Sequence, residues 1–139
     1  MIQAFVADCS VTIAWAVPSQ SSKATDGLLD HLAAGTTLIV PVLWFFEVAN
    51  TLIVLTRRKK LSRESCDRAR SMLAALAPVA DTEGAGVALH ATSSLADRYS
   101  LSVYDAAYLE LALRRGIPLA TSDAALASAA RQANTAVLL

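Results

Sequence analysis

The sequence predicts an α/β fold, in which a central parallel sheet of four to five strands is flanked by helices. Short apolar, β-prone runs alternate with helical segments along the chain, and this alternation is typical of a parallel sheet covered on both faces. The chain has 139 residues, the usual size of one globular domain. No linker, repeat or low-complexity segment divides it, so we expect residues 1–139 to form a single domain.

The expected strands are short runs rich in apolar and β-branched residues. They cover residues 2–7, 37–40, 78–80, 117–121 and 135–139. The run at 78–80 is the weakest of them, and it decides whether the sheet has four strands or five.

Helices are expected between these strands, and local signals mark several of their ends. They cover residues 12–17, 19–34, 41–58, 64–76, 82–99, 104–115 and 122–134. Pro41 would lie in the first turn of its helix, a position that suits proline. Ser62 is a suitable N-cap for the helix that follows it. Gly35 and Gly116 follow two of the helices, where a left-handed residue commonly ends the helix.

The longest apolar segment, residues 38–55, also has the length of a membrane span and a basic flank at 57–60. Pro41 breaks this segment near its start. Glu47 and Asn50 lie near its centre, where a carboxylate costs roughly 2.5–3.5 kcal/mol. We therefore expect a strand followed by a helix, and no membrane association.

Composition excludes several classes of protein. The formal net charge is zero, so nucleic-acid binding would depend on local clusters of basic residues rather than on the overall field. Cys9 and Cys66 lack the spacing of a zinc site or a disulfide framework, and we interpret them as reduced thiols of a cytoplasmic protein. His31 and His90 are isolated. Residues 1–7 lack a basic leader and are followed by Asp8, unlike a signal peptide.

Four acids are expected to meet at one edge of the sheet. Asp8 directly follows the first strand, and Asp123 follows the strand at 117–121 almost directly. Glu47 lies about two turns into the helix after the second strand, and Asp105 opens the helix at 104–115. Sites in parallel sheets lie beyond the carboxyl ends of the strands, so these four acids are the candidate site.

Each acid also has a purely structural interpretation. Asp8 could merely end a strand, while Asp105 and Asp123 could be N-caps, with Ser122 an alternative to Asp123. Glu47 lies on a helix that is apolar nearly all round, and no lysine or arginine lies three or four residues away. A buried carboxylate is costly unless it finds a partner elsewhere in the fold or binds a cation.

Packed carboxylates indicate a particular chemistry. They repel one another, which raises some of their pKa values unless a cation neutralises them. Oxygen ligands without sulfur or imidazole select Mg²⁺ or Mn²⁺ rather than zinc. Such a cation lowers the pKa of a bound water and neutralises charge on a phosphate. The four acids therefore indicate hydrolysis of a phosphodiester.

Four ordered motifs also carry a resemblance to a known family. They read FVADCSVTIAW, PVLWFFEVANTL, LSVYDAAYLELALRRGIPLAT and TSDAAL, and they contain Asp8, Glu47, Asp105 and Asp123 in turn. In order, spacing and total length the chain resembles PIN domains, and among them the VapC-type toxins of bacterial toxin–antitoxin pairs. The resemblance covers essentially the whole chain.

This resemblance implies an Mg²⁺- or Mn²⁺-dependent endoribonuclease that cleaves RNA, forms a homodimer and is inhibited by a cognate antitoxin. Asp8, Glu47 and Asp105 would be the main acidic ligands, and Asp123 would complete the site directly or through water.

Three smaller residues near these acids have expected roles. Ser10 and Thr121 match small hydroxyl positions that orient acids or a water, although local capping of a loop is an equal alternative. Cys9 would be an apolar filler whose side chain points away from Asp8, because neighbours in an extended segment alternate.

Several basic and aromatic residues could contact partners. The basic run at 57–60, Arg98, Arg114 and Arg115 are possible phosphate contacts, although a solvated helix end is the plainer explanation for the run. The large aromatic residues could be core or could form a groove for an antitoxin or a dimer partner: Trp15, Trp44, Phe45 and Phe46. They cannot all be core, because neighbours on one helix point in different directions.

Two other functions remain possible at this point. A haloacid-dehalogenase-type phosphatase would use Asp8 as a nucleophile, but Ser10 stands where such enzymes carry a second aspartate, and no lysine is suitably placed. A PIN-like module without catalytic activity would use the acids for a structural cation or for none.

Overall fold

A single parallel sheet lies at the centre of the computed structural model, which describes residues 2–139. Its strands are β1 (Ala4–Ala7), β2 (Thr37–Pro41), β3 (Val79–Asp81), β4 (Leu119–Ala120) and β5 (Val137–Leu138). Within the described range these five strands have the order β3-β2-β1-β4-β5, and every neighbouring pair is parallel. The predicted α/β fold class is confirmed, with five strands.

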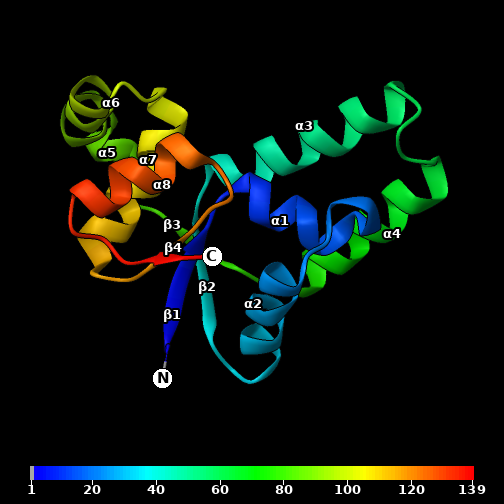
Figure 1. The fold of residues 1–139 in the computed structure, drawn as a ribbon. Helices are drawn as coiled ribbons and strands as arrows, with labels where there is room; N and C mark the ends of the chain where they lie inside the picture. The colour runs from blue at the N-terminus through cyan, green and yellow to red at the C-terminus, as the bar shows by residue number, and fades with distance from the viewer. Residues whose placement is uncertain (1) are drawn as a thin grey trace.

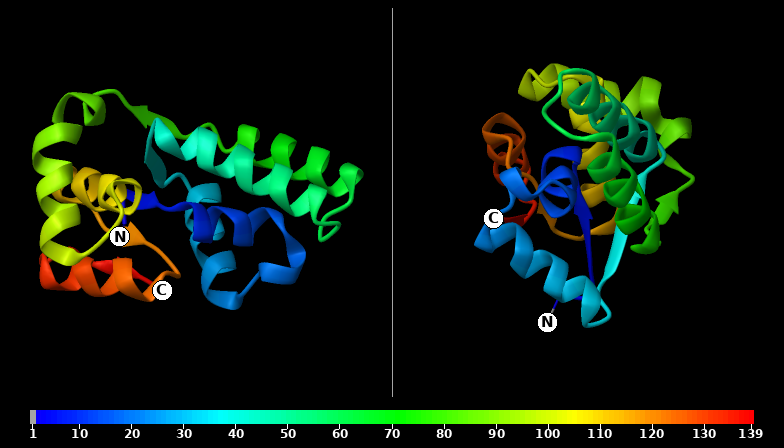
Figure 2. Two further views of the ribbon diagram at one scale, coloured as in Figure 1. Left: turned by 90° about the horizontal axis from the view of Figure 1, so that it is seen from above. Right: turned by 90° about the vertical axis from the view of Figure 1, so that its right-hand side faces the viewer.

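Helices cover both faces of this sheet. They are α1 (Cys9–Ala16), α2 (Lys23–Ala33), α3 (Leu43–Arg57), α4 (Arg63–Ala75), α5 (Gly84–Val87), α6 (Ser93–Tyr99), α7 (Val103–Arg115) and α8 (Ala124–Gln132). A 3-10 turn, η1 (Pro18–Gln20), and a π-helical turn, η2 (Ala88–Thr92), lie between them. Figure 1 shows α1–α4 on one side of the sheet and α5–α8 on the other, and Figure 2 shows the same two groups from above.

The core fills the space between the sheet and these helices. Phe5 and Val6 of β1 and Leu109 of α7 are fully buried, and each such side chain contributes about 1.5–3 kcal/mol by leaving water. Both tryptophans are core residues whose indole N–H groups are satisfied: Trp15 donates to the Thr25 carbonyl at 2.7 Å. Trp44 likewise donates to the hydroxyl of Thr12 at 2.8 Å.

Phe45 and Phe46 behave differently from the tryptophans. They are 41% and 70% exposed. The expectation that the four large aromatic residues could not all be core is therefore confirmed.

Two predicted helix starts are wrong. Pro41 is the last residue of β2, where it is in register with Asp81, and α3 begins only at Leu43. The helix expected from residue 19 begins at Lys23, because Ser22 and Thr25 form a capping box there.

Other predicted boundaries shift for local reasons. Helix α1 begins at Cys9 rather than at residue 12, because the Asp8 side chain accepts from the Val11 N–H and caps the helix. The helix expected over 82–99 is divided into α5, η2 and α6. The predictions for Ser62 as an N-cap and for Gly116 as a left-handed helix end, with φ of 64°, are confirmed.

The apolar segment 38–55 is divided between β2 and α3. In the part of the chain that the structure describes, no helix is both long and apolar enough to cross a membrane.

Candidate active site

Asp8 lies at the carboxyl end of β1 and is held through both of its carboxylate oxygens. The Ser10 hydroxyl donates to Oδ1 at 2.6 Å, and the Thr121 hydroxyl donates to Oδ2 at 2.5 Å. The Val11 N–H also donates to Oδ1 at 3.2 Å. With only 5% of the residue exposed, the carboxylate has a fixed orientation at the edge of the sheet.

The same two hydroxyls join Asp8 to the turn after β4. The Ser122 N–H donates to Ser10 Oγ at 3.0 Å, and the Asp123 N–H donates to Thr121 Oγ1 at 3.0 Å. Ser10 and Thr121 therefore contact both Asp8 and the segment that carries Asp123. This arrangement is consistent with an orienting role, which remains a prediction.

Asp123 combines a structural role with an exposed position. Its Oδ1 accepts from the Leu126 N–H at 2.8 Å and caps α8, so the capping interpretation is correct for this residue. The side chain is exposed at the carboxyl edge of the sheet, beside the turn that carries Thr121.

Glu47 has a partner that the sequence interpretation missed. The Tyr108 hydroxyl of α7 donates to Glu47 Oε1 at 2.5 Å, and Tyr108 is only 1% exposed. The buried face of α3 consists of Trp44, Val48 and Leu52, and Glu47 is half-buried beside it. Helix α3 is thus apolar nearly all round but buried on one face only, and the alternative of a partner elsewhere in the fold is correct.

Asp105 is not the cap of its helix. Ser102 caps α7 by accepting from the Asp105 N–H at 3.0 Å, so the Asp105 carboxylate lies within the first turn without a capping role. The interpretation of Asp105 as an N-cap is therefore wrong.

A signal for Tyr108 did exist in the sequence. Tyr108 follows Asp105 by three residues, and residues three apart on a helix share a face.

Electrostatics joins these residues into one group, here called the acidic cluster: Asp8, Glu47, Asp105 and Asp123. Burial raises the pKa of the carboxyl groups of Asp8, Glu47 and Asp105. Repulsion from other members of the cluster raises these pKa values further. The charge of Asp123 raises the pKa of Asp8. The pKa of Glu47 is raised by Asp105 and Asp8, and that of Asp105 by Asp123 and Asp8. Each acid is therefore close enough to another to feel its charge.

The chemistry of the acidic cluster fits a hard divalent cation. Its donors are all oxygens, and among residues 2–139 no lysine, arginine or histidine forms an ion pair with any of the four. In the same range, no three His, Cys, Asp or Glu side chains are placed as a ready metal-binding group. The structure thus brings the acids within electrostatic reach, and the sharing of one coordination sphere remains a prediction.

Cys9 adjoins this cluster. It is the first residue of α1 rather than part of an extended segment, so the alternation argument for its direction is wrong. Its Sγ lies 3.4 Å from the Thr51 hydroxyl of α3. Burial, followed by the charges of Glu47 and Asp8, raises the pKa of the thiol to about 11, so it is protonated at neutral pH and is a poor nucleophile.

A second group of charges at the same edge differs in having its own cations. This arginine-paired cluster consists of Asp81, Glu83, Glu110, Arg114 and Arg115. Arg114 donates to both oxygens of Asp81 at 2.9 and 2.8 Å, and to both oxygens of Glu110 at 2.8 and 2.9 Å. Hydrogen bonding to Arg114 lowers the pKa of the Asp81 carboxyl to about 2, and the same bonds raise the pKa of Arg114.

The arginine-paired cluster revises one expectation. Arg114 was a possible phosphate contact, but its guanidinium is bound to three carboxylates. The spacing of Glu110 and Arg114, four residues apart on one helix, could have indicated this pair. Asp81 had no local signal, because its partner lies 33 residues further along the chain.

Comparisons with known proteins agree with this architecture. The family model of the PIN domain matches residues 5–132. None of the curated proteins gives a match.

Three solved structures share the fold. PAE2754 from Pyrobaculum aerophilum is 21% identical, with a TM-score of 0.70 over 96% of this chain and 82% of that one. FitAcB from Neisseria gonorrhoeae is 16% identical, with a TM-score of 0.67 over 97% and 96% of the two chains. VapBC2 from Rickettsia felis, bound to a promoter DNA fragment, is 10% identical, with a TM-score of 0.66 over 96% of both.

The family model spans most of the chain, and it includes all four members of the acidic cluster. The central parallel sheet and the helices that flank it are those expected from the resemblance. The chain belongs to the PIN-domain family.

Proposed function

We propose that this protein is an Mg²⁺- or Mn²⁺-dependent endoribonuclease that acts as the toxin of a toxin–antitoxin pair. The observation that carries the proposal is the acidic cluster itself. Three of its carboxyl groups have raised pKa values, and no basic side chain among the described residues pairs with any of the four. Membership of the PIN-domain family supports a nuclease.

The proposal assigns different tasks to the four acids. Asp8, Glu47 and Asp105 would hold the cation, and Asp123 would complete the site directly or through water. When bound, the cation would supply charge neutralisation at the phosphate and a water of lowered pKa. Ser10 and Thr121 would keep the Asp8 oxygens in position, because each hydroxyl donates to one of the two oxygens.

Residues around the acids would keep the site ordered. Tyr108 would orient Glu47 through its hydroxyl. The Trp44 indole donates to Thr12, whose hydroxyl donates to the Asp8 carbonyl at 2.8 Å, so α3 and the start of α1 are tied together. Such fixed supports matter because catalysis requires acids whose positions do not change during the reaction.

The proposed partners are RNA, a cognate antitoxin protein and a second copy of the chain. The names VapBC2 and FitAcB of two similar structures support the toxin–antitoxin assignment. The exposed Phe45 and Phe46 rings are apolar surface that a protein partner would cover. A cytoplasmic location fits the free thiols of Cys9 and Cys66.

A PIN-like binding module without catalytic activity is the second candidate. It is favoured by one observation, that no three potential ligands among residues 2–139 form a ready metal-binding group. PIN-family membership leaves the haloacid-dehalogenase alternative without support.

The test is RNA cleavage by the purified protein. We expect single-stranded RNA to be cut in Mg²⁺ or Mn²⁺, and cleavage to stop when EDTA is added. Asp105→Asn, purified in parallel, serves as the control for contaminating ribonucleases. RNA that stays intact with either cation, or that is cut equally in EDTA, would overturn the proposal, and the first result would favour the binding module.

A further inference from the structure

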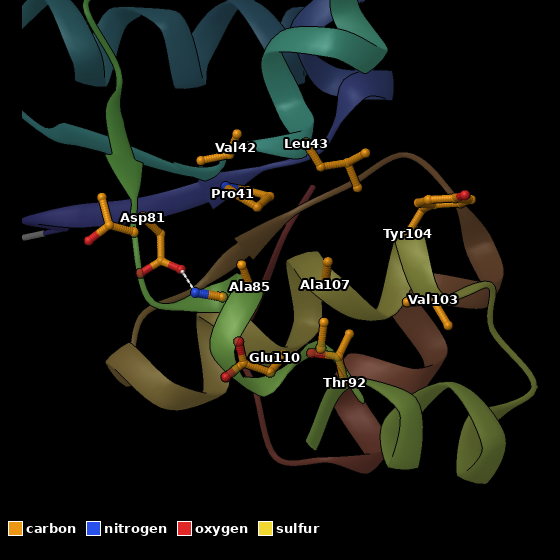
Figure 3. A pocket seen from close by; sticks show the side chains of 13 residues that line it. Pro41, Val42, Leu43, Asp81, Ala85, Thr92, Val103, Tyr104, Ala107 and Glu110 are labelled. Carbon is orange, nitrogen blue, oxygen red and sulfur yellow. Dashed lines mark hydrogen bonds between the residues drawn. The ribbon is translucent and has the colours of Figure 1, made fainter. Parts of the chain in front are cut away.

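A cavity of about 300 Å³ lies beside the acidic cluster, and none of its lining residues has so far been assigned a role in catalysis. Figure 3 shows its walls, which come from the ends of β2 and β3, the starts of α3 and α5, the π-helical turn η2 and one face of α7. Most of the lining is apolar, as at Pro41, Leu43, Tyr104 and Ala107. Irregular π-helical turns are frequent at functional sites.

The cavity and the acidic cluster are neighbours along one edge of the sheet. Tyr104 lines the cavity and directly precedes Asp105, while Leu43 lines it one helical turn before Glu47. Pro41 ends β2, which pairs with β1, the strand that leads to Asp8. Because paired strands lie about 4.8 Å apart, the cavity wall at Pro41 lies beside the end of the strand that leads to Asp8.

Two polar groups in the cavity wall have unused hydrogen-bonding capacity. Thr92 is only 2% exposed, and no hydrogen bond from its hydroxyl is found among the described residues. No fully buried polar side-chain atom lacks a partner in that range, so the Thr92 hydroxyl keeps a small exposed surface. Thr92 is one of the residues that line the cavity.

Glu110 is the second of these groups. Arg114 donates one hydrogen bond to each of its oxygens, at 2.8 and 2.9 Å. A carboxylate has about four acceptor sites, so about two remain for a ligand.

The charge of the lining decides which part of a ligand it can hold. Asp81 and Glu110 are both in the wall, and no lysine or arginine is among the lining residues that the structure describes. Arg114 pairs with both carboxylates, so a phosphate would find no unpaired cation among these lining residues. A flat, neutral group with apolar faces and N–H donors on its edge fits, because carboxylates accept from the amino groups of bases. The Tyr104 ring, 62% exposed, offers a stacking surface.

We propose that this cavity holds an unpaired nucleobase with an exocyclic amino group, on the nucleotide next to the phosphodiester that is cut at the acidic cluster. The inference rests on the proposed ribonuclease function and narrows its substrate to single-stranded RNA. Thr92 and Glu110 bind the edge of the base, and Tyr104 packs against its face.

The test uses nucleosides, which have no phosphate and so report on the cavity alone. We expect cytidine, adenosine or guanosine to cause saturable NMR shifts at the amides of η2 and of residues 103–107, at millimolar concentrations. Uridine, which lacks an exocyclic amino group, should bind several-fold more weakly. Ala107→Phe, which fills the cavity, should abolish the shifts.

Matched variants separate recognition from folding. Thr92→Val should weaken nucleoside binding about threefold to tenfold, the usual effect of one lost hydrogen bond. Leu89→Ala changes an 87% exposed residue of the same turn and should bind like the wild type. Asp105→Asn should bind nucleosides normally while losing RNA cleavage.

Several results would overturn the inference. One is the absence of saturable shifts with every nucleoside, and another is the same binding in Ala107→Phe as in the wild type. A third combines two observations: the wild type binds no nucleoside, and Ala107→Phe no longer sediments with the mass of the wild type. This result would assign the cavity to a protein contact. RNA cleavage without nucleoside binding would contradict only the cavity, whereas nucleoside binding without cleavage would contradict the ribonuclease.

Discussion

The acidic cluster and the arginine-paired cluster lie at the same edge of the same sheet and have opposite electrostatics. Asp81 is the last residue of β3, Asp8 directly follows β1, and both residues are nearly fully buried, at 2% and 5% exposure. The Arg114 guanidinium lowers the pKa of Asp81 to about 2, whereas burial and a neighbouring acid raise the pKa of Asp8. Burial is common to the two sites, so the presence of a protein cation makes the difference.

This difference separates a structural site from a functional one. In the arginine-paired cluster, Arg114 links α7 to the end of β3 and to Glu83, which lies just before α5, so the charges hold the fold together. In the acidic cluster the charges oppose the fold unless something from outside neutralises them. A protein retains such an unfavourable group where it serves binding or catalysis.

The largest expected effect is on catalysis. Asp8→Asn and Asp105→Asn should each lower RNA cleavage at least about 1000-fold, because a cation contributes several kcal/mol and each 1.36 kcal/mol is tenfold in rate. Folding should persist, since asparagine is as good an N-cap as aspartate at position 8. Single-turnover cleavage rates and circular dichroism measure both.

Glu83→Gln is the matched control for this prediction, because it removes a carboxylate that is 70% exposed and belongs to the other cluster. It should cleave RNA like the wild type. Cleavage by Asp8→Asn and Asp105→Asn at the wild-type rate would show that the acidic cluster is not the catalytic site.

A substitution in the arginine-paired cluster should instead lower the stability of the fold. Asp81→Ala should lower the free energy of unfolding by about 3 kcal/mol, because it removes a buried partner of the Arg114 charge. This value is the low end for a broken buried ion pair, because Glu110 still pairs with Arg114. Urea denaturation measures the loss. Glu83→Ala, at an exposed position, should cost less than about 1 kcal/mol. Equal effects of the two substitutions would mean that the arginine-paired cluster does not stabilise the fold.

A bound divalent cation should neutralise the acidic cluster, as Arg114 neutralises the arginine-paired cluster. Mn²⁺ at 100 times its Kd should stabilise the wild type by about 2.7 kcal/mol, because a ligand that binds only the folded state stabilises it by mass action. The double variant Asp8→Asn, Asp105→Asn should show no gain, while Asp81→Ala should gain as much as the wild type. A melting temperature that does not change with millimolar Mn²⁺ would count against a cation site.

Sequence patterns predicted the fold, and they also selected four acids that the structure brings within electrostatic reach of one another, because both inferences depend on local features. Alternating apolar runs predicted the parallel sheet, and the position of Asp8 after β1 placed it at the carboxyl edge. The sequence could not show which acids have partners, because Tyr108 lies 61 residues from Glu47, and Arg114 lies 33 residues from Asp81. Such pairs exist only after packing. Pro41 was misplaced because proline fits both a strand end and a first helical turn.

Tyr108→Phe addresses one of these long-range partners. Loss of its hydroxyl should weaken Mn²⁺ binding about tenfold, the low end for removal of a group that orients a metal ligand. The free energy of unfolding should fall by only about 1 kcal/mol. Calorimetric titration measures the affinity. Tyr99→Phe, a tyrosine on α6, should change neither quantity, and an unchanged affinity in Tyr108→Phe would mean that Glu47 needs no positioning.

The smallest expected effect is a pH dependence of the metal-free protein. The folded-state pKa values of Asp8, Glu47 and Asp105 are raised, so these groups bind more protons in the folded than in the unfolded state. Their contribution to stability is therefore complete below their ordinary pKa values and is lost as the pH rises through the raised pKa values.

Asp81 acts in the opposite direction, but its contribution is lost only as the pH falls below 3.8 towards about 2. In EDTA, the wild type should thus gain stability relative to Asp8→Asn, Asp105→Asn as the pH falls through the raised pKa values towards the ordinary carboxyl range. Comparison with this double variant cancels contributions from residues outside the cluster. Parallel stability curves for the two proteins would mean that folding does not raise the pKa values of Asp8 and Asp105.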